Sequence, residues 1–168
     1  MSFVVKSTTT YKKPNKAIID MNDAQIPPLT SYRFSNDFET RFARVYSLKE
    51  EKIIICELKS EYVPIAHFKD TFYQISDLVK SGLNNKFIFD KRSLRAFHQP
   101  SMEWYYVEWK RDMLALGLKT HRKILPREAW FRKSVAIAKD QIHQHYPDNV
   151  VDQLDVKYCE SVEEAIVA

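Results

Sequence analysis

Four aromatic side chains within six residues are the most unusual chemical feature of this sequence. Trp104, Tyr105, Tyr106 and Trp109 lie in a segment whose apolar spacing predicts a helix. Successive residues of a helix point about 100° apart, so the four rings cannot share one face. Tyr106 and Trp109 fit a buried stripe, whereas Trp104 and Tyr105 face either a neighbouring helix or solvent. An apolar groove made by Trp104, Tyr105 and Trp109 would bind a partner protein or a small lipid-like molecule.

A second candidate is the basic segment between residues 118 and 133. Glu128 is its one acidic residue, and a rim of cations in contact with water is the simplest interpretation. Binding of an anionic ligand, or weak contact with an anionic membrane surface, is the functional alternative. The basic residues of this segment are Lys119, Arg122, Lys123, Arg127, Arg132 and Lys133.

A third candidate is enzymatic and rests on the sequence Glu57-Leu58-Lys59, which follows an apolar run. Glu-x-Lys at the end of a strand occurs in metal-dependent nucleases, where carboxylates hold Mg²⁺ and the lysine assists the attacking water. Asp37 lies upstream as a second carboxylate. A nuclease using Glu57 and Lys59, or another hydrolase, is therefore the alternative function.

Residue counts exclude several other kinds of site. The 168 residues contain only two glycines, too few for a phosphate-binding loop, a dinucleotide-binding turn or a Gly-x-Ser-x-Gly nucleophile elbow. Two cysteines supply neither a disulfide framework nor a zinc ligand set, and the five histidines have no metal-ligand spacing. The net charge of +4 is too small and too dispersed for a specific nucleic-acid binder. We therefore expect no metal and no cofactor.

The elements that must position these residues alternate between strands and helices. A hairpin (42–58) comes first, and two predicted helices end at Gly82 and Gly117, where glycine favours a helix stop. This order predicts an α/β fold with a mixed, mostly parallel sheet of five strands and about four helices. The proline-containing segment 1–38 is expected to form an extended arm, with Ala17-Ile18-Ile19 as its apolar cluster. The later predicted elements are a strand at 86–90, a helix from Pro100-Ser101, a strand at 121–125, a helix at 131–146, a strand at 154–158 and a short helix opening at Ser161.

The placement of residues on these elements resembles the STAS domain, in its SpoIIAA-like branch related to anti-sigma-factor antagonists. The resemblance covers residues 39–168. Its features are the opening hairpin, the strand Phe87-Ile88-Phe89 ending in Asp90, and the aromatic helix after a Pro-Ser start. The closing strand at Tyr158, followed by a Ser-x-Glu-Glu-Ala helix, completes it.

The resemblance implies a domain without catalysis that binds a partner, as SEC14-like and STAS-like relatives bind lipids or proteins. Members of this family are switched by phosphorylation of a serine in an Asp-Ser-Ser-Gly motif. This chain instead has Asp90-Lys91-Arg92-Ser93, so the glycine is missing and two cations replace the serines. Ser93 is the remaining phosphorylation candidate, and a phosphate there would pair with Arg92 or Arg95.

We therefore expect a regulatory or ligand-binding module that contacts a protein or a small apolar or anionic ligand. The aromatic helix supplies Trp104, Tyr105 and Trp109, and the segment with Asp90, Arg92 and Arg95 forms the rim. No apolar run is long enough to span a membrane, which favours a cytoplasmic location. A purely structural role, in which the arm joins two copies into a homodimer, is a further hypothesis.

Overall fold

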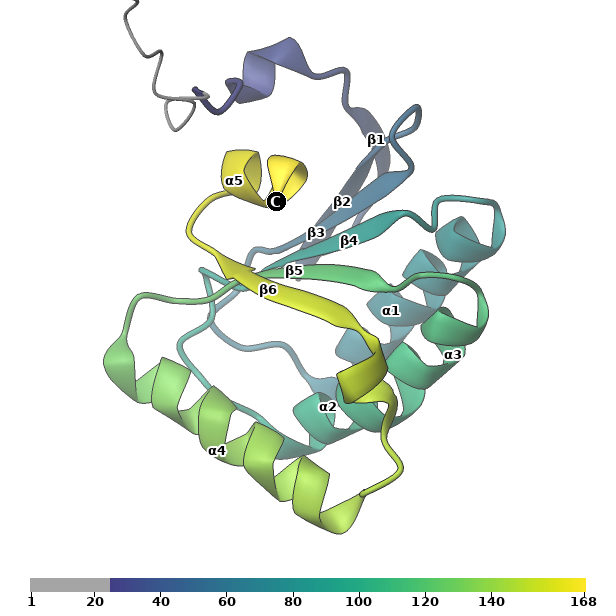
Figure 1. Ribbon diagram of the computed structural model, residues 1–168. Helices are drawn as coiled ribbons and strands as arrows, with labels where there is room; N and C mark the ends of the chain where they lie inside the picture. The colour runs from purple at the N-terminus through teal and green to yellow at the C-terminus, as the bar shows by residue number, and fades with distance from the viewer. Residues whose placement is uncertain (1–24) are drawn as a thin grey trace, which may run out of the picture.

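Six strands form one mixed sheet whose spatial order follows the order of the sequence, as the computed structural model shows for residues 25–168 (Figure 1). The first three strands are antiparallel neighbours, and the last four run parallel. The predicted mixed, mostly parallel α/β sheet is thus confirmed. The strands are β1 (Ser35–Glu39), β2 (Ala43–Leu48), β3 (Ile53–Leu58), β4 (Lys86–Asp90), β5 (Thr120–Ile124) and β6 (Asp155–Cys159).

The predicted strand number of five was too low because β1 was missed. Its sequence, Ser-Asn-Asp-Phe-Glu, is mostly polar, and the register with β2 shifts between Asn36 and Phe38. An edge strand with such a bulge lacks the alternation by which strands are recognised. The sheet consequently begins inside the segment 1–38 that was expected to be an extended arm. The cluster Ala17-Ile18-Ile19 lies outside the described residues.

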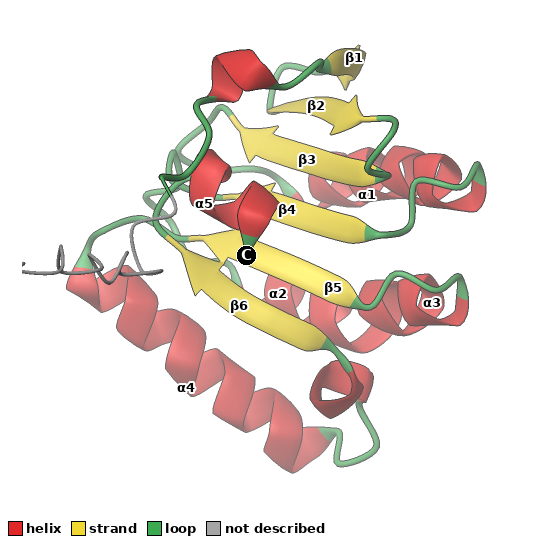
Figure 2. Ribbon diagram, turned by 45° about the horizontal axis from the view of Figure 1, so that its top comes forward, coloured by secondary structure: helices red, strands yellow, loops and turns green. Residues whose placement is uncertain are grey.

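The helices occupy the two faces of the sheet unequally (Figures 1 and 2). The connections between the parallel strands lie together on one face, whereas α5 returns to the opposite face over β4, β5 and β6. Each face therefore has its own apolar core. The helices are α1 (Ile65–Lys80), α2 (Gln99–Trp104), α3 (Lys110–Ala115), α4 (Ala129–His145) and α5 (Val162–Val167), with short turns η1 (Leu29–Ser31) and η3 (Val150–Gln153).

Residues 99–115, between β4 and β5, form one continuous helix with a π-helical turn in its middle. This turn, η2 (Tyr105–Trp109), joins α2 to α3. Trp109 fixes the turn to α1, since its indole Nε1 donates hydrogen bonds to the Phe72 carbonyl (3.1 Å) and to Ser76 Oγ (3.0 Å). A π-helical turn inserts an extra residue into a helix and is found mostly at functional sites.

Both glycines end helices, as the sequence predicted. Gly82 follows α1 at φ +111°, and Gly117 follows α3 at φ +90°. In each case the amide after the glycine bonds back five residues, from Leu83 to Leu78 (3.2 Å) and from Leu118 to Met113 (3.0 Å). This pairing is the Schellman helix end, which requires a residue that tolerates positive φ. In the described part of the chain no helix is long and apolar enough to cross a membrane.

Replacing Gly82 with alanine tests the helix end by itself. A Cβ atom there would meet nothing within 4 Å, so the cost comes from the backbone alone. We expect Gly82→Ala to lower the free energy of unfolding by about 1–2 kcal/mol, measured by urea denaturation. Gly117→Ala should cost at least as much, because its Cβ would lie 3.3 Å from Asn84 Nδ2. A Gly82→Ala variant as stable as the original protein would contradict this assignment.

Candidate functional site

An apolar pocket opens at the carboxyl ends of β3 and β4, on the face covered by the helices. Loops that follow parallel strands meet at this edge, which is where open α/β sheets bind ligands. Here the two loops are tied together, because the amides of Arg95 and Ala96 donate to the Glu61 carbonyl at 2.9 and 3.2 Å. The pocket therefore has a fixed rim on two sides.

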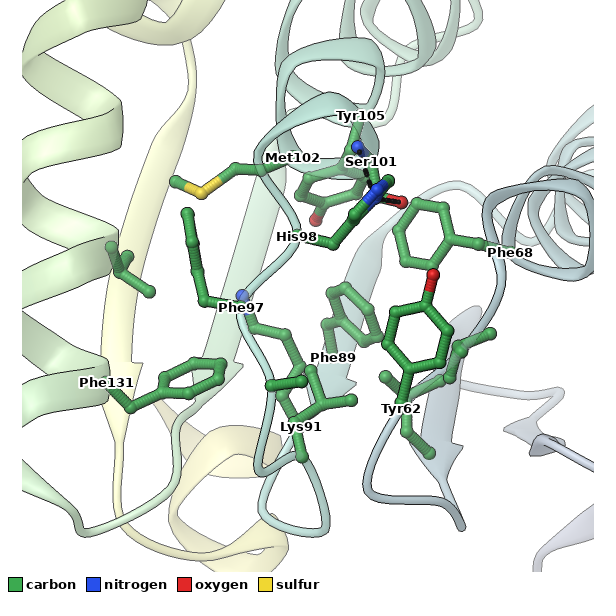
Figure 3. A pocket seen from close by; sticks show the side chains of 15 residues that line it. Tyr62, Phe68, Phe89, Lys91, Phe97, His98, Ser101, Met102, Tyr105 and Phe131 are labelled. Atoms are coloured by element: carbon green, nitrogen blue, oxygen red, sulfur yellow. Dashed lines mark hydrogen bonds between the residues drawn. The ribbon is translucent and has the colours of Figure 1, made fainter.

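Aromatic and aliphatic side chains form the walls of this pocket (Figure 3). Phe89 comes from β4, Tyr105 from η2 and Phe131 from α4, so three elements distant in the sequence meet here. The enclosed volume is about 60 Å³. The remaining lining residues are Leu58, Tyr62, Val63, Phe68, Lys91, Leu94, Ala96, Phe97, His98, Ser101, Met102 and Val135.

Among the described residues, Lys91 is the one cationic side chain that lines this pocket. It continues the alternation of β4 beyond its end, so that its side chain follows Phe87 and Phe89 onto the helix-covered face. The residue is only 7% exposed, and its amine lies 5.1 Å from the Phe89 ring centroid. Burial lowers the pKa of Lys91 to about 8, with no described carboxylate near enough to offset the effect. The amine is thus a cation that lacks an anionic partner.

Two further polar groups lie along the same pocket. The Tyr105 hydroxyl is buried and has no hydrogen-bond partner among the described residues. His98 caps the start of α2: its Nδ1 accepts from the Ser101 amide at 3.3 Å and lies 2.8 Å from Ser101 Oγ. Since Nδ1 accepts these bonds, the imidazole proton resides on Nε2. Tyr62, which packs edge-on against His98, is 46% exposed and lies at the solvent side.

Two more lysines lie fully buried behind the pocket, between the helices and the sheet. Lys110 is the first residue after the π-helical turn, and Lys123 projects from β5 beside Phe89. Their amines lie 4.5 and 4.0 Å from the Tyr106 ring centroid, and Lys123 also donates to the Tyr106 hydroxyl. Burial holds the pKa of each well below its usual value, and the nearby Lys91 lowers both further.

This result corrects the interpretation of the basic segment as a water-exposed rim for Arg122 and Lys123 only, since Lys119, Arg127 and Lys133 are exposed and Arg132 is half-buried. Lys123 is fully buried, and Arg122 is 3% exposed on the opposite face, where it donates to Asp155 Oδ2 at 2.8 Å. A cation in the middle of a sheet is unusual, because desolvation disfavours the charged form. Arg122 has its carboxylate partner, whereas Lys123 has only a tyrosine hydroxyl and aromatic rings.

The three aromatic residues named from the sequence have different positions. Tyr105 lines the pocket, as described above. Trp104 packs against α1, with its ring 5.6 Å from that of Tyr73, and is 6% exposed. Trp109 is 2% exposed and anchors the π-helical turn. Tyr105 is therefore the member of this set that lines the pocket, with its ring stacked on that of Trp109 at 5.4 Å, whereas Trp104 borders a groove between α1 and α2.

The charged residues named for the rim form ion pairs on the side of the loop away from the pocket. Arg92 forms a bidentate ion pair with Asp90, with Nε 3.0 Å from Oδ1 and a terminal nitrogen 2.6 Å from Oδ2. Arg95 binds the Arg92 carbonyl (2.8 Å) and lies 3.4 Å from Glu128 Oε1. Ser93 sits half-buried in the turn between them. Phosphorylation of Ser93 stays a prediction.

The residues of the enzymatic alternative engage different partners. Lys59 donates to Glu39 Oε1 at 2.6 Å, and Asp37 pairs with Lys49. Glu57 lies on β3, next to Asp90 of β4 and separated from Asp37 by the whole of β2. In residues 25–168, no group of three or more histidine, cysteine, aspartate or glutamate side chains could hold a metal ion.

The sequence analysis did not identify Lys91, Lys110 or Lys123 as buried residues. Lys110 carried a detectable signal, because it falls between Tyr106 and Met113 at helical spacing on the buried stripe. For Lys91 the only signal was its position directly after a buried strand. Lys123 had none, since its burial follows from the pairing of β5 with β4 and β6.

Comparisons of the chain with protein-family models, with curated proteins and with solved structures gave no match.

Removing a buried amine should make the protein more stable. Lys110 Nζ has no hydrogen-bond partner among the described residues. Lys110→Met should therefore raise the free energy of unfolding at pH 7 by about 1–3 kcal/mol, because a buried donor without a partner costs that much. Urea denaturation measures the change.

The same variant should alter the dependence of stability on pH. Because the pKa of Lys110 is lowered on folding, the unfolded chain binds the extra proton, and stability rises as the pH approaches the unfolded value near 10.5. Lys110→Met lacks this contribution, so its stability should rise less between pH 7 and 9. The exposed residue Lys119 provides the control, since Lys119→Met should leave the pH dependence unchanged. An unchanged slope in Lys110→Met, together with a loss of stability, would contradict the buried-cation assignment.

Proposed function

We propose that this protein is a ligand-binding module that takes a small apolar molecule bearing a carboxylate. The apolar part lies among Phe68, Phe89, Phe97 and Phe131, and the carboxylate pairs with Lys91. The observation that carries the proposal is the Lys91 amine, buried in an apolar pocket with no described carboxylate beside it. An anionic ligand would supply the missing charge and restore part of the lost solvation energy.

The composition of the pocket supports the proposal independently of the charge. Small-molecule sites are mostly apolar and carry a few polar groups that orient the ligand. Here those groups are Lys91, the Tyr105 hydroxyl and the His98–Ser101 pair. Of the site residues named from the sequence, Tyr105 lines this pocket, and the segment after β4 contributes Lys91 and Leu94 to it.

The size of the pocket favours a short ligand over a long lipid. The cavity volume of about 60 Å³ is far below the roughly 300–1,000 Å³ of sites that hold drug-sized ligands. A chain of three or four carbons would fill it, with the polar head beside Lys91 and the mouth near Tyr62. We take butyrate as the probe for this reason.

A STAS-like scaffold of the SpoIIAA branch is part of the proposal. Its support is the order of the elements: an antiparallel hairpin of β2 and β3, then β4, β5 and β6 parallel to β3, with the aromatic helix after β4. In this proposal the protein regulates through binding, and it carries out no metal-dependent hydrolysis at Glu57 and Lys59.

Butyrate binding tests the proposed function. We expect butyrate to shift the ¹H–¹⁵N resonances of Lys91, Leu94 and Phe97 in a saturable titration at pH 7. Lys91→Met should weaken binding by about 10- to 100-fold, because a hydrogen bond to a charged group contributes about 1.5–3 kcal/mol. Butan-1-ol, which lacks the charge, should bind the original protein more weakly than butyrate does.

Lys69 provides the matched control for the lost positive charge. Its amine lies 5.3 Å from the Trp104 ring centroid in the groove between α1 and α2, outside the pocket. Lys69→Met should bind butyrate as the original protein does. Resonance shifts confined to the groove, or equal loss of binding in both variants, would refute the pocket as the binding site.

A further inference from the structure

We propose that Lys91 forms an imine with a small aliphatic aldehyde or ketone held in the pocket. The inference rests on the proposed function, because it assigns a second class of ligand, a carbonyl compound, to the same pocket. Its basis is the placement of a buried amine, a free tyrosine hydroxyl and an apolar cavity at one edge of the sheet (Figure 3).

The surroundings of Lys91 suit an amine nucleophile. A lysine becomes nucleophilic when an apolar environment or a second cation disfavours its protonated form. The first condition occurs here: Lys91 is 7% exposed in an apolar pocket, and burial is what lowers its pKa. The titratable groups that share the pocket wall are Tyr62, His98 and Tyr105, and a carboxylate is not among them.

The lowered pKa of Lys91 agrees with imine formation at this amine. With a pKa of about 8, about a tenth of the Lys91 amine is neutral at pH 7, compared with about one part in 2,500 for a lysine with the ordinary value of 10.4. Lys110 and Lys123 also have lowered pKa values, but neither lines the pocket. Lys91 therefore combines a neutral fraction with access to a ligand.

The reaction is balanced without any oxidant or reductant. The lone pair of the neutral Lys91 nitrogen attacks the carbonyl carbon, and one of the two amine protons is transferred to the carbonyl oxygen to give a neutral carbinolamine. As the C–O bond breaks, the proton that is left on the nitrogen is transferred to the departing oxygen, so that a C=N bond forms and one water molecule leaves. Hydrolysis by the same steps releases the carbonyl compound, and binding is reversible.

Tyr105 is the hydrogen-bond donor for the reacting oxygen. Tyr105 lines the same pocket, and its hydroxyl is buried and has no hydrogen-bond partner among the described residues. Burial raises the pKa of Tyr105 well above its usual value, so the hydroxyl keeps its proton at neutral pH. A neutral hydroxyl can donate to the carbonyl oxygen and then to the carbinolamine oxygen. The π-helical turn, which begins at Tyr105, orients this side chain.

Reductive trapping with butanal tests the inference. The full-length protein is incubated at pH 7 with butanal and cyanoborohydride, which reduces an imine to a stable N-butyl amine. Peptide mass spectrometry then gives the initial rate of butylation at each lysine. We expect Lys91 to react at least about 10-fold faster than the exposed residues Lys69 and Lys119, and added butyrate should slow the reaction at Lys91 alone.

Two variants keep the test independent of folding. Tyr105→Phe keeps the ring and removes a hydroxyl without a partner, so it should fold normally and slow the reaction at Lys91 several-fold. Lys91→Met should lose the fast reaction and keep the slow reaction of the surface lysines. Equal rates at Lys91 and at the surface lysines would overturn the imine assignment, and an unchanged rate in Tyr105→Phe would overturn the role of Tyr105.

The butyrate titration separates the two proposals. If butyrate binds at Lys91 but butanal labels only exposed lysines, imine formation is wrong and the binding function stands. If butyrate neither binds nor protects and Lys91 is not labelled, the pocket itself is wrong and both proposals fail.

Discussion

The main physical constraint between the helices and the sheet of this protein is the desolvation of lysine amines. Moving an ammonium group out of water is costly unless a carboxylate or a set of hydrogen bonds replaces the lost hydration. Among residues 25–168, Lys91, Lys110 and Lys123 receive neither a carboxylate nor a full set of hydrogen-bond acceptors, and aromatic rings lie close to all three amines. Rings stabilise a cation only in part, so these amines keep lowered pKa values. Three such amines in one layer lower the stability of the fold there. Ionisable groups with shifted pKa values are common at functional sites, where a ligand completes their environment.

The fold explains why only one of the three amines is available to a ligand. Lys91 lies just past the end of β4, where the loops after β3 and β4 line the pocket. Lys123 lies deeper in the fold, within β5. Lys110 lies buried beneath its own helix. The π-helical turn is the element that connects these positions, since Tyr105, Tyr106 and Lys110 all belong to it or adjoin it. Trp109 secures the same turn to α1 through two hydrogen bonds.

Most of the architecture followed from the sequence because local patterns determine it. The hairpin, the apolar strand β4 and the two glycine helix ends each have a signal within a few residues. The edge strand β1 has none, since it is polar and irregular. The charged residues were harder: a lysine normally indicates a surface position, and the sequence does not specify which strand lies beside it. Tyr105 was named as a contact from its helical position, whereas its neighbour Lys91 was passed over in favour of Asp90 and Arg92. Those two residues pair with each other on the other side of the loop.

The most direct test is the pKa of Lys91, measured by heteronuclear NMR of its side-chain amine. It tests whether this amine is desolvated and able to bind an anion. The structure predicts a pKa of about 8 in the free protein. A bound carboxylate stabilises the protonated amine, so saturation with butyrate should raise that pKa toward the ordinary value near 10.4. A pKa near 10.4 in the free protein, unchanged by butyrate, would show that water already solvates the amine and would contradict the assignment of the pocket.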